Sequence, residues 1–206
     1  SITSGAGTNQ ITVDYGTNAV SGDVTVTPVN TCGTGILSSL AITVNTTPAA
    51  PGTIDGNTTI CFGSSNTYSV ASVSGATSYG WMLPGGWSGT STTNTISTTA
   101  GSSGTMTVTP INSCGTSSDQ TLSVTVNAVP ATPGTISGNT TICSGSSNSY
   151  SISSVSGATS YNWSLPGGWN GTSTTNTIST TAGISGTVSV TATNGCGTSS
   201  AQTLLV

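Results

Sequence analysis

The sequence predicts an all-β fold: tandem antiparallel β-sandwiches of the immunoglobulin-like kind, arranged as a rod. Three observations lead to this prediction. The 206-residue sequence repeats with a period of 82 residues, short stretches alternate polar and apolar side chains, and no stretch shows a long i, i+3, i+4 apolar stripe. A period of this size is typical of a small folded module copied along the chain, and the missing stripe argues against helices.

The repeat is visible in residues that recur without any slip in register. Cys32, Cys114 and Cys196 are 82 residues apart. Residues 51–124 and 133–206 are identical at 58 of 74 aligned positions. Sequence copies this similar should adopt the same fold, so features that persist between copies indicate what the module needs.

The register of the repeat also sets the expected domain boundaries. Residues 1–47 match only the C-terminal part of a module. We therefore expect a partial module at 1–47, a full module at 48–129 and a nearly full module at 130–206. The chain is interpreted as a window on a longer tandem array.

Period-two alternation of side chains predicts the strands of each module, because it places one strand face on a core and the other in water. Clusters of Gly, Ser and Asn between them are typical of turns. About seven short strands per module fit an immunoglobulin-like sandwich better than the short coils of a β-solenoid. The expected strands include 23–27, 40–44, 68–70, 79–81, 95–97, 105–109, 122–126 and 187–191.

Proline pairs mark the connections between modules. Pro48 and Pro51 precede the first full module, and Pro130 and Pro133 precede the next. Prolines spaced in this way favour an extended, semi-rigid connector over a flexible one. The connectors therefore predict that the modules line up as a rod.

The composition excludes several classes of function. The chain has no Lys, Arg or His, and its only acidic side chains are Asp14, Asp23, Asp55 and Asp119. Without cations it cannot neutralise phosphates, so we expect no nucleic-acid binding and no polybasic membrane patch. No apolar run approaches the roughly 18 residues of a membrane span, so membrane insertion is not expected.

Catalysis and metal binding are also not expected. No Asp recurs from copy to copy, whereas a repeated calcium site would need several carboxylates at fixed positions. General acid–base chemistry lacks a tunable proton carrier, and a Ser nucleophile lacks a His or Lys to activate it. We predict no enzyme activity, no cofactor and no metal site.

The cysteines predict a disulfide in each module. Cys61 and Cys114 are 53 residues apart, as are Cys143 and Cys196, and no zinc or redox spacing is present. We expect bonds Cys61–Cys114 and Cys143–Cys196, each stabilising its module by roughly 4 kcal/mol, and hence an oxidising compartment. The alternative is that these cysteines are buried free thiols. Cys32 has no partner within the sequence.

The densest motif resembles a known family. Residues 79–87 (YGWMLPGGW) recur as 161–169 (YNWSLPGGW), and Tyr-x-Trp before a tight Gly turn resembles the central strand of PKD domains. Residues 186–197 (GTVSVTATNGCG) resemble the PKD-like repeats of very large surface adhesins of gliding Bacteroidota. The resemblance implies a PKD-like sandwich, export by the type IX secretion system and a role in gliding. The usual Gly-Asp-Gly turn is Pro-Gly-Gly here, which removes its acidic residue.

Four tryptophans recur within this motif. Trp81 and Trp163 alternate with Tyr on a strand, and we expect them in the core. Trp87 and Trp169 follow the Pro-Gly-Gly turn. An exposed Trp there would suit stacking on a sugar ring. The alternative is a Trp folded back over the edge of the sandwich.

Together these observations predict a structural stalk segment of a long extracellular, cell-surface adhesin or filament, extending an adhesive tip. The alternative is a carbohydrate-binding repeat that adheres to polysaccharide through many weak Trp contacts. Expected partners are adjoining modules, surface polysaccharide or other cell-surface components, and identical chains in a bundle. An ice-binding role would need a flat Thr ladder, and residues 90–99 are too irregular for one.

Overall fold

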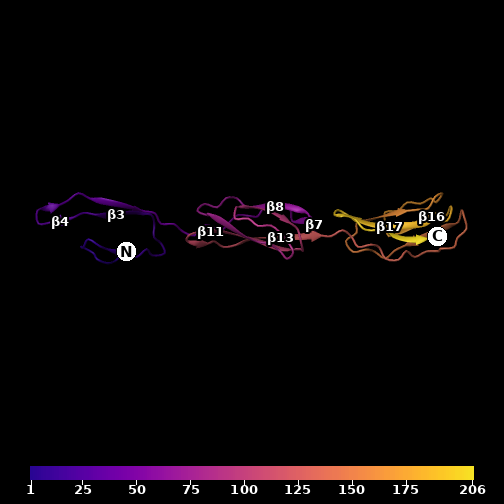
Figure 1. The fold of residues 1–206 in the computed structure, drawn as a ribbon, viewed down its shortest axis with the longest axis horizontal. Coiled ribbons are helices and arrows are strands. Elements are labelled where there is room, and N and C mark those ends of the chain that lie inside the picture. The colour runs from indigo at the N-terminus through magenta and orange to yellow at the C-terminus, as the bar shows by residue number, and fades with distance from the viewer.

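The computed structural model describes residues 1–206 as three bodies placed end to end along one axis, as shown in Figure 1. All of its regular structure is β, with no helix, so the all-β prediction is confirmed. The described chain accordingly contains no helix with the length and apolar character needed to cross a bilayer.

The strands follow one another with short turns between them. The first body contains β1 (Ile2–Ser4), β2 (Thr12–Val13), β3 (Gly22–Val26), β4 (Val29–Asn30), β5 (Gly33–Thr34) and β6 (Ser38–Ile42). The second contains β7 (Thr59–Cys61), β8 (Ser65–Ser69), β9 (Ser78–Met82), β10 (Thr95–Thr99), β11 (Gly104–Asn112), β12 (Gly115–Thr116) and β13 (Gln120–Asn127). The third contains β14 (Ser147–Ser151), β15 (Ser160–Ser164), β16 (Thr177–Thr181), β17 (Thr187–Asn194), β18 (Gly197–Thr198) and β19 (Gln202–Leu205).

The second body, the middle module, is a two-layer sandwich. One layer is the antiparallel pair β8 and β10. In the other layer β11 pairs with β9, β12 and β13, and β13 pairs in turn with β7. The layers enclose a core because each strand buries alternate residues. In β11, Met106 and Val108 are fully buried while the intervening Thr107 is not. Period two in the sequence thus becomes one apolar face per strand.

The third body, the last module, repeats this arrangement with Tyr150, Val188 and Val190 fully buried in its core. The antiparallel pairs β14–β16, β15–β17 and β17–β19 correspond to those of the middle module.

One pairing departs from the antiparallel expectation. β7 pairs with β13 in parallel, with Cys61 opposite Asn127. β7 therefore runs in the same direction as β13, and it lies beside the end of β13 where the chain leaves the middle module for the connector. β7 was not among the strands predicted from alternation, since its three residues are too few to show one.

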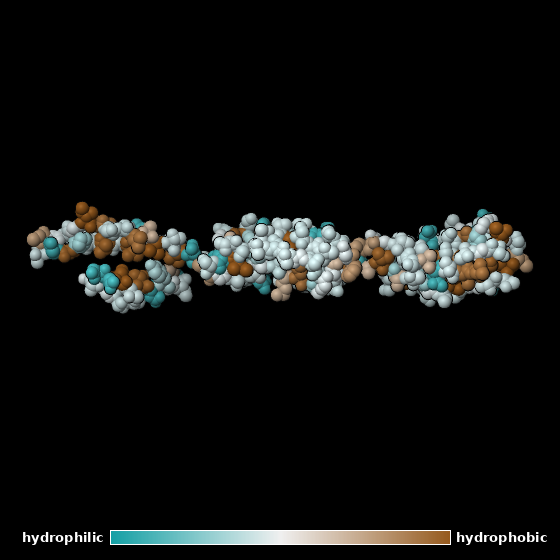
Figure 2. Space-filling view, in the orientation of Figure 1, coloured by the Kyte–Doolittle hydropathy of each residue, from teal (hydrophilic) through white to brown (hydrophobic).

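The first body has no apolar core. It consists of three separate two-stranded ladders, β1–β2, β3–β6 and β4–β5. Large apolar side chains such as Val20 and Ile36 are 84% and 92% exposed. Figure 2 shows apolar groups gathered on this body, whereas the middle module is mostly covered by residues of intermediate hydropathy. The last module shows a further apolar patch in this view.

The Pro-Gly-Gly turn shapes one edge of each full module. The Trp87 backbone N–H donates to the Pro84 carbonyl at 3.3 Å, and the turn requires a positive φ of 76° at Gly86. Glycine adopts this conformation without steric cost, as in a type II turn. The turn directs Trp87 back towards the sandwich.

Candidate functional site

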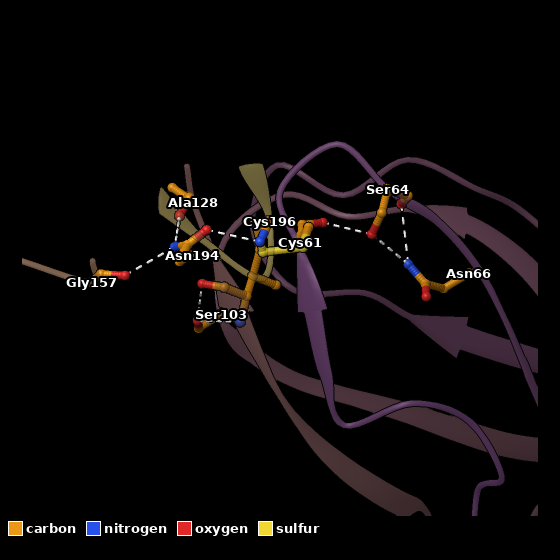
Figure 3. Close-up of a disulfide and its surroundings, with 9 residues drawn as sticks. Cys61, Ser64, Asn66, Ser103, Ala128, Gly157, Asn194 and Cys196 are labelled. Atoms are coloured by element: carbon orange, nitrogen blue, oxygen red, sulfur yellow. Dashed lines mark hydrogen bonds between the residues drawn. A yellow bond between two sulfur atoms is a disulfide. The ribbon is translucent and has the colours of Figure 1, made fainter. Parts of the chain in front are cut away.

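The junction between the middle and last modules is the most elaborate feature of the chain. A disulfide joins Cys61 of the middle module to Cys196 of the last one, across 135 residues of sequence (Figure 3). Their Cα atoms are 5.4 Å apart, within the usual range for a disulfide. The bond therefore covalently links two modules that are consecutive in the array.

Two local structures bring these cysteines together. Cys61 ends β7, and the parallel ladder holds it opposite Asn127, where the connector begins. The next residue, Phe62, donates its backbone N–H to the Asn127 carbonyl at 2.8 Å. Cys196 lies in the tight turn between β17 and β18, where the Asn194 Oδ1 accepts a hydrogen bond from the Cys196 backbone N–H at 2.8 Å.

Asn194 also fastens the connector to the last module. Its Nδ2 donates to the carbonyls of Ala128 in the connector and Gly157 in the module, at 2.8 and 3.1 Å (Figure 3). One amide group thus uses both its donor and its acceptor atoms to fix the turn and the connector. The junction is held by a ladder, a side-chain bridge and a disulfide.

The preceding junction repeats the side-chain bridge but has neither the parallel ladder nor the disulfide. The Asn112 Nδ2 donates to the carbonyls of Thr46 in the connector and Gly75 in the module, at 2.7 and 3.0 Å. Its Oδ1 accepts from the Cys114 backbone N–H at 2.8 Å. The Cys114 Sγ donates a weak hydrogen bond to the Asn45 carbonyl at 3.4 Å. Asn45 is the counterpart of Asn127.

The predicted pairs Cys61–Cys114 and Cys143–Cys196 are therefore wrong. Cys61 lies at the end of the middle module that meets the last module, whereas Cys114 lies against the connector at its other end. The two cysteines of the middle module thus lie at opposite ends of the sandwich and cannot bond to each other, and Cys196 is bonded to Cys61 rather than to Cys143. Cys32, Cys114 and Cys143 are free and exposed, which also excludes the alternative of buried thiols at these three positions.

Trp81 and Trp163 pack in the core as expected. Trp163 is 9% exposed, and Trp81 packs against the middle module's core. Their indole N–H groups donate to the carbonyls of Thr93 and Thr175, both at 2.9 Å. The polar atom of each indole is thus satisfied within its own module.

Of the two possibilities considered for Trp87 and Trp169, the structure shows the ring folded back over the sandwich edge rather than an exposed sugar platform. Trp169 is 8% exposed and belongs to the last module's core, while Trp87 is partly buried against the middle one. Their indole N–H groups donate to the carbonyls of Ser102 and Ile184. The turn folds each ring back over the edge of the sandwich. Each ring packs against its own module, and its N–H group is already hydrogen-bonded there.

Each of these rings meets a buried tyrosine. The ring centroids of Tyr68 and Trp87 are 6.0 Å apart, and those of Tyr150 and Trp169 are 5.9 Å apart. The tyrosine hydroxyls donate to the carbonyls of Asn57 and Asn139. Burial raises the pKa of both tyrosines, because it disfavours the charged phenolate.

The acidic side chains serve local contacts. Asp23 accepts a hydrogen bond from Ser39, and Asp119 accepts one from Thr109. No three Cys, Asp, Glu or His side chains gather where they could hold a metal ion.

The roles of Asn112 and Asn194 were not predicted from the sequence. The signal was available, since an Asn stands two residues before Cys32, Cys114 and Cys196 alike. An Asn side chain commonly accepts a hydrogen bond from the backbone two residues on, so this spacing indicates a side-chain-supported turn at each cysteine.

Comparison with known proteins identifies the module. The chain matches the PKD-like domain family over residues 1–42, 47–124 and 129–206. No curated protein sequence matches it.

Several solved structures align with the chain at low sequence identity. The eight N-terminal immunoglobulin domains of Down Syndrome Cell Adhesion Molecule align with a TM-score of 0.50 and 12% identity, over 93% of this chain and 35% of that one. The chain thus spans about a third of that structure. The FN1-FN3 domains of chicken CNTN1 align at a TM-score of 0.35 and 17% identity, covering 86% and 71%. The Escherichia coli adhesin FdeC aligns at 0.42 and 16%, covering 90% and 73%.

Proposed function

The chain belongs to the PKD-like domain family in three tandem copies, and we propose that it is a structural stalk segment of a long extracellular adhesin or filament. In this role the modules hold an adhesive tip away from the cell and transmit force. The function is mechanical, so no residue of the segment needs to bind a ligand.

The disulfide across a module junction is the observation that carries this proposal. A chain of independent domains on flexible linkers would need no contact at its junctions. Here the Cys61–Cys196 bond, the β7–β13 ladder and the Asn194 bridge all act at the boundary between two modules. These contacts favour a role in which the relative position of neighbouring modules matters.

The same disulfide supports an extracellular location. Disulfides form and persist in oxidising environments such as the cell exterior and the periplasm. The absence of Lys and Arg also leaves trypsin-like proteases no cleavage site in this chain. We therefore propose that the segment lies at the cell surface.

The resemblance of residues 79–87 and 186–197 to repeats of giant Bacteroidota adhesins extends the proposal. On that basis the parent protein is a surface adhesin exported by the type IX system, and its stalk moves in gliding motility. The junction contacts suit such a role, since gliding would load the stalk along its length.

Polysaccharide binding through Trp87 and Trp169 is the weaker candidate, because both indoles pack against their own modules. Adjoining modules of the same chain are the partners that the junction supports best. Surface polysaccharide, other cell-surface components and bundling with identical chains remain proposals for the parent protein.

Immunogold electron microscopy of intact cells of the source organism tests the proposed function. Antibodies raised against residues 1–206 should label extended projections outside the cell envelope, at a distance from the surface. Label confined to the cell interior, or to a layer lying flat on the envelope, would contradict the stalk.

A further inference from the structure

The one disulfide of the chain follows a simple rule in the repeat. Cys61 and Cys196 are separated by 135 residues, which is one 82-residue period more than the separation of Cys61 and Cys114. The cysteine near the start of one module thus bonds the cysteine near the end of the following module. We call these the leading and trailing cysteines.

Each free thiol has a bonded counterpart elsewhere in the chain. Cys143 is the leading cysteine of the last module and corresponds to the bonded Cys61. Cys32 and Cys114 are trailing cysteines and correspond to the bonded Cys196. All three are exposed, and none has a partner within the chain.

The surroundings of Cys114 are prepared for the same bond. Asn112 fixes its turn and bridges to the connector as Asn194 does at Cys196. The Cys114 Sγ faces the Asn45 carbonyl, and Asn45 corresponds to the residue that pairs with Cys61. Cys114 therefore already lies where the leading cysteine of a preceding module would arrive.

We propose that Cys114 and Cys143 are linking positions for adjoining PKD-like modules, and that the array carries a disulfide across every junction. This inference deepens the stalk function proposed above and rests on it for the existence of further modules. Each bond forms when two thiols lose two protons and two electrons to a thiol–disulfide oxidant, which is itself reduced to two thiols.

Such bonds would overlap along the chain. The loop closed by Cys61 and Cys196 contains Cys143, so the next bond begins before the previous loop has ended. Two interleaved covalent paths would then run through the array. Each path crosses a disulfide to a trailing cysteine, then follows the chain through the connector to the next leading cysteine, where the next disulfide begins. The rest of each module lies outside the path.

Disulfide mapping of an extended chain tests the proposal. Residues 125–206 are appended once more after Val206, which preserves the repeat register. The appended copy carries Ala201→Asp, because the middle module has Asp119 at this position. The substitution gives the peptide that holds the appended copy of Cys196 a distinct mass. The chain is expressed with export to an oxidising compartment, alkylated, digested with a chymotrypsin-like protease and mapped without reduction.

We expect Cys143 to be bonded to the appended copy of Cys196, with Cys61–Cys196 unchanged. A bond between Cys143 and the Cys196 of its own module, or a Cys143 that stays free while Cys61–Cys196 forms, would overturn the proposal. Failure to find Cys61–Cys196 in the 206-residue chain would overturn the pairing rule itself.

Cys143→Ser in the extended chain provides the matched control. It should leave Cys61–Cys196 intact, and the appended copy of Cys196 should be found as an alkylated free thiol. The map is also independent of the immunogold result. Labelled projections without bonds across the junctions would leave the stalk function standing and reject the linking positions.

Discussion

At the residue scale, the Pro-Gly-Gly-Trp motif is explained by packing. The positive φ of Gly168, 77°, allows the turn that folds Trp169 onto Tyr150, and the indole N–H is satisfied by Ile184. The motif recurs because each module needs this cover over its core.

Replacing Trp169 by Ala should therefore lower stability. We expect the free energy of unfolding of the last module to fall by about 3–5 kcal/mol, as for other large-to-small core substitutions. Urea unfolding followed by circular dichroism measures the change. Leu205→Ala, at a side chain that is 75% exposed, is the control and should change stability by no more than about 0.5 kcal/mol. A stable Trp169→Ala variant that loses polysaccharide binding would favour the carbohydrate-binding alternative.

The buried tyrosines predict a loss of stability in alkali. Burial raises the pKa of Tyr68 and Tyr150 in the folded state above the ordinary value of 10.0. The unfolded chain thus loses these protons at lower pH than the folded chain. Their contribution is complete below about pH 10 and is lost as the pH rises through the folded-state pKa.

Denaturant unfolding across this pH range, with free thiols alkylated, measures the effect. The double variant Tyr68→Phe and Tyr150→Phe should lose this part of the pH dependence, while losing about 1 kcal/mol per hydroxyl hydrogen bond at neutral pH. An unchanged alkaline slope in the double variant would contradict the assignment.

At the element scale, alternation predicted the strands that build the two layers. It succeeded for β11, β13 and β17 because each buries alternate residues. It gave no warning of β7, whose parallel pairing with β13 depends on how the chain leaves the module. The predicted disulfide pairs were wrong for a related reason. Spacing along the sequence does not show which end of the sandwich each cysteine occupies.

A close backbone approach between two turns gives a prediction at this scale. A Cβ on Gly101 would lie 2.7 Å from the backbone nitrogen of Trp87, whereas a Cβ on Gly85 in the same turn region meets nothing within 4 Å. We expect Gly101→Ala to destabilise the middle module by about 1–3 kcal/mol, as overpacking does. Gly85→Ala should change stability by less than about 0.5 kcal/mol. Equal thermal unfolding midpoints for the two variants would refute the close approach.

At the scale of the whole molecule, the modules form a line whose second junction is closed by a covalent bond. Tension applied at the two chain ends passes along residues 1–61, through the disulfide, and along residues 196–206. The residues between the two cysteines lie inside the closed loop and cannot be extended while the bond persists. The bond thus limits how far a loaded stalk segment can lengthen.

Single-molecule pulling of the 206-residue chain from its two ends tests this account most directly. Added reductant should release the loop and increase the maximum extension by roughly 450 Å, from 135 residues at about 3.4 Å each. Cys61→Ser should show the longer extension without reductant, and Cys32→Ser should behave like the parent chain. Full extension of the oxidised parent chain without reductant would contradict the account.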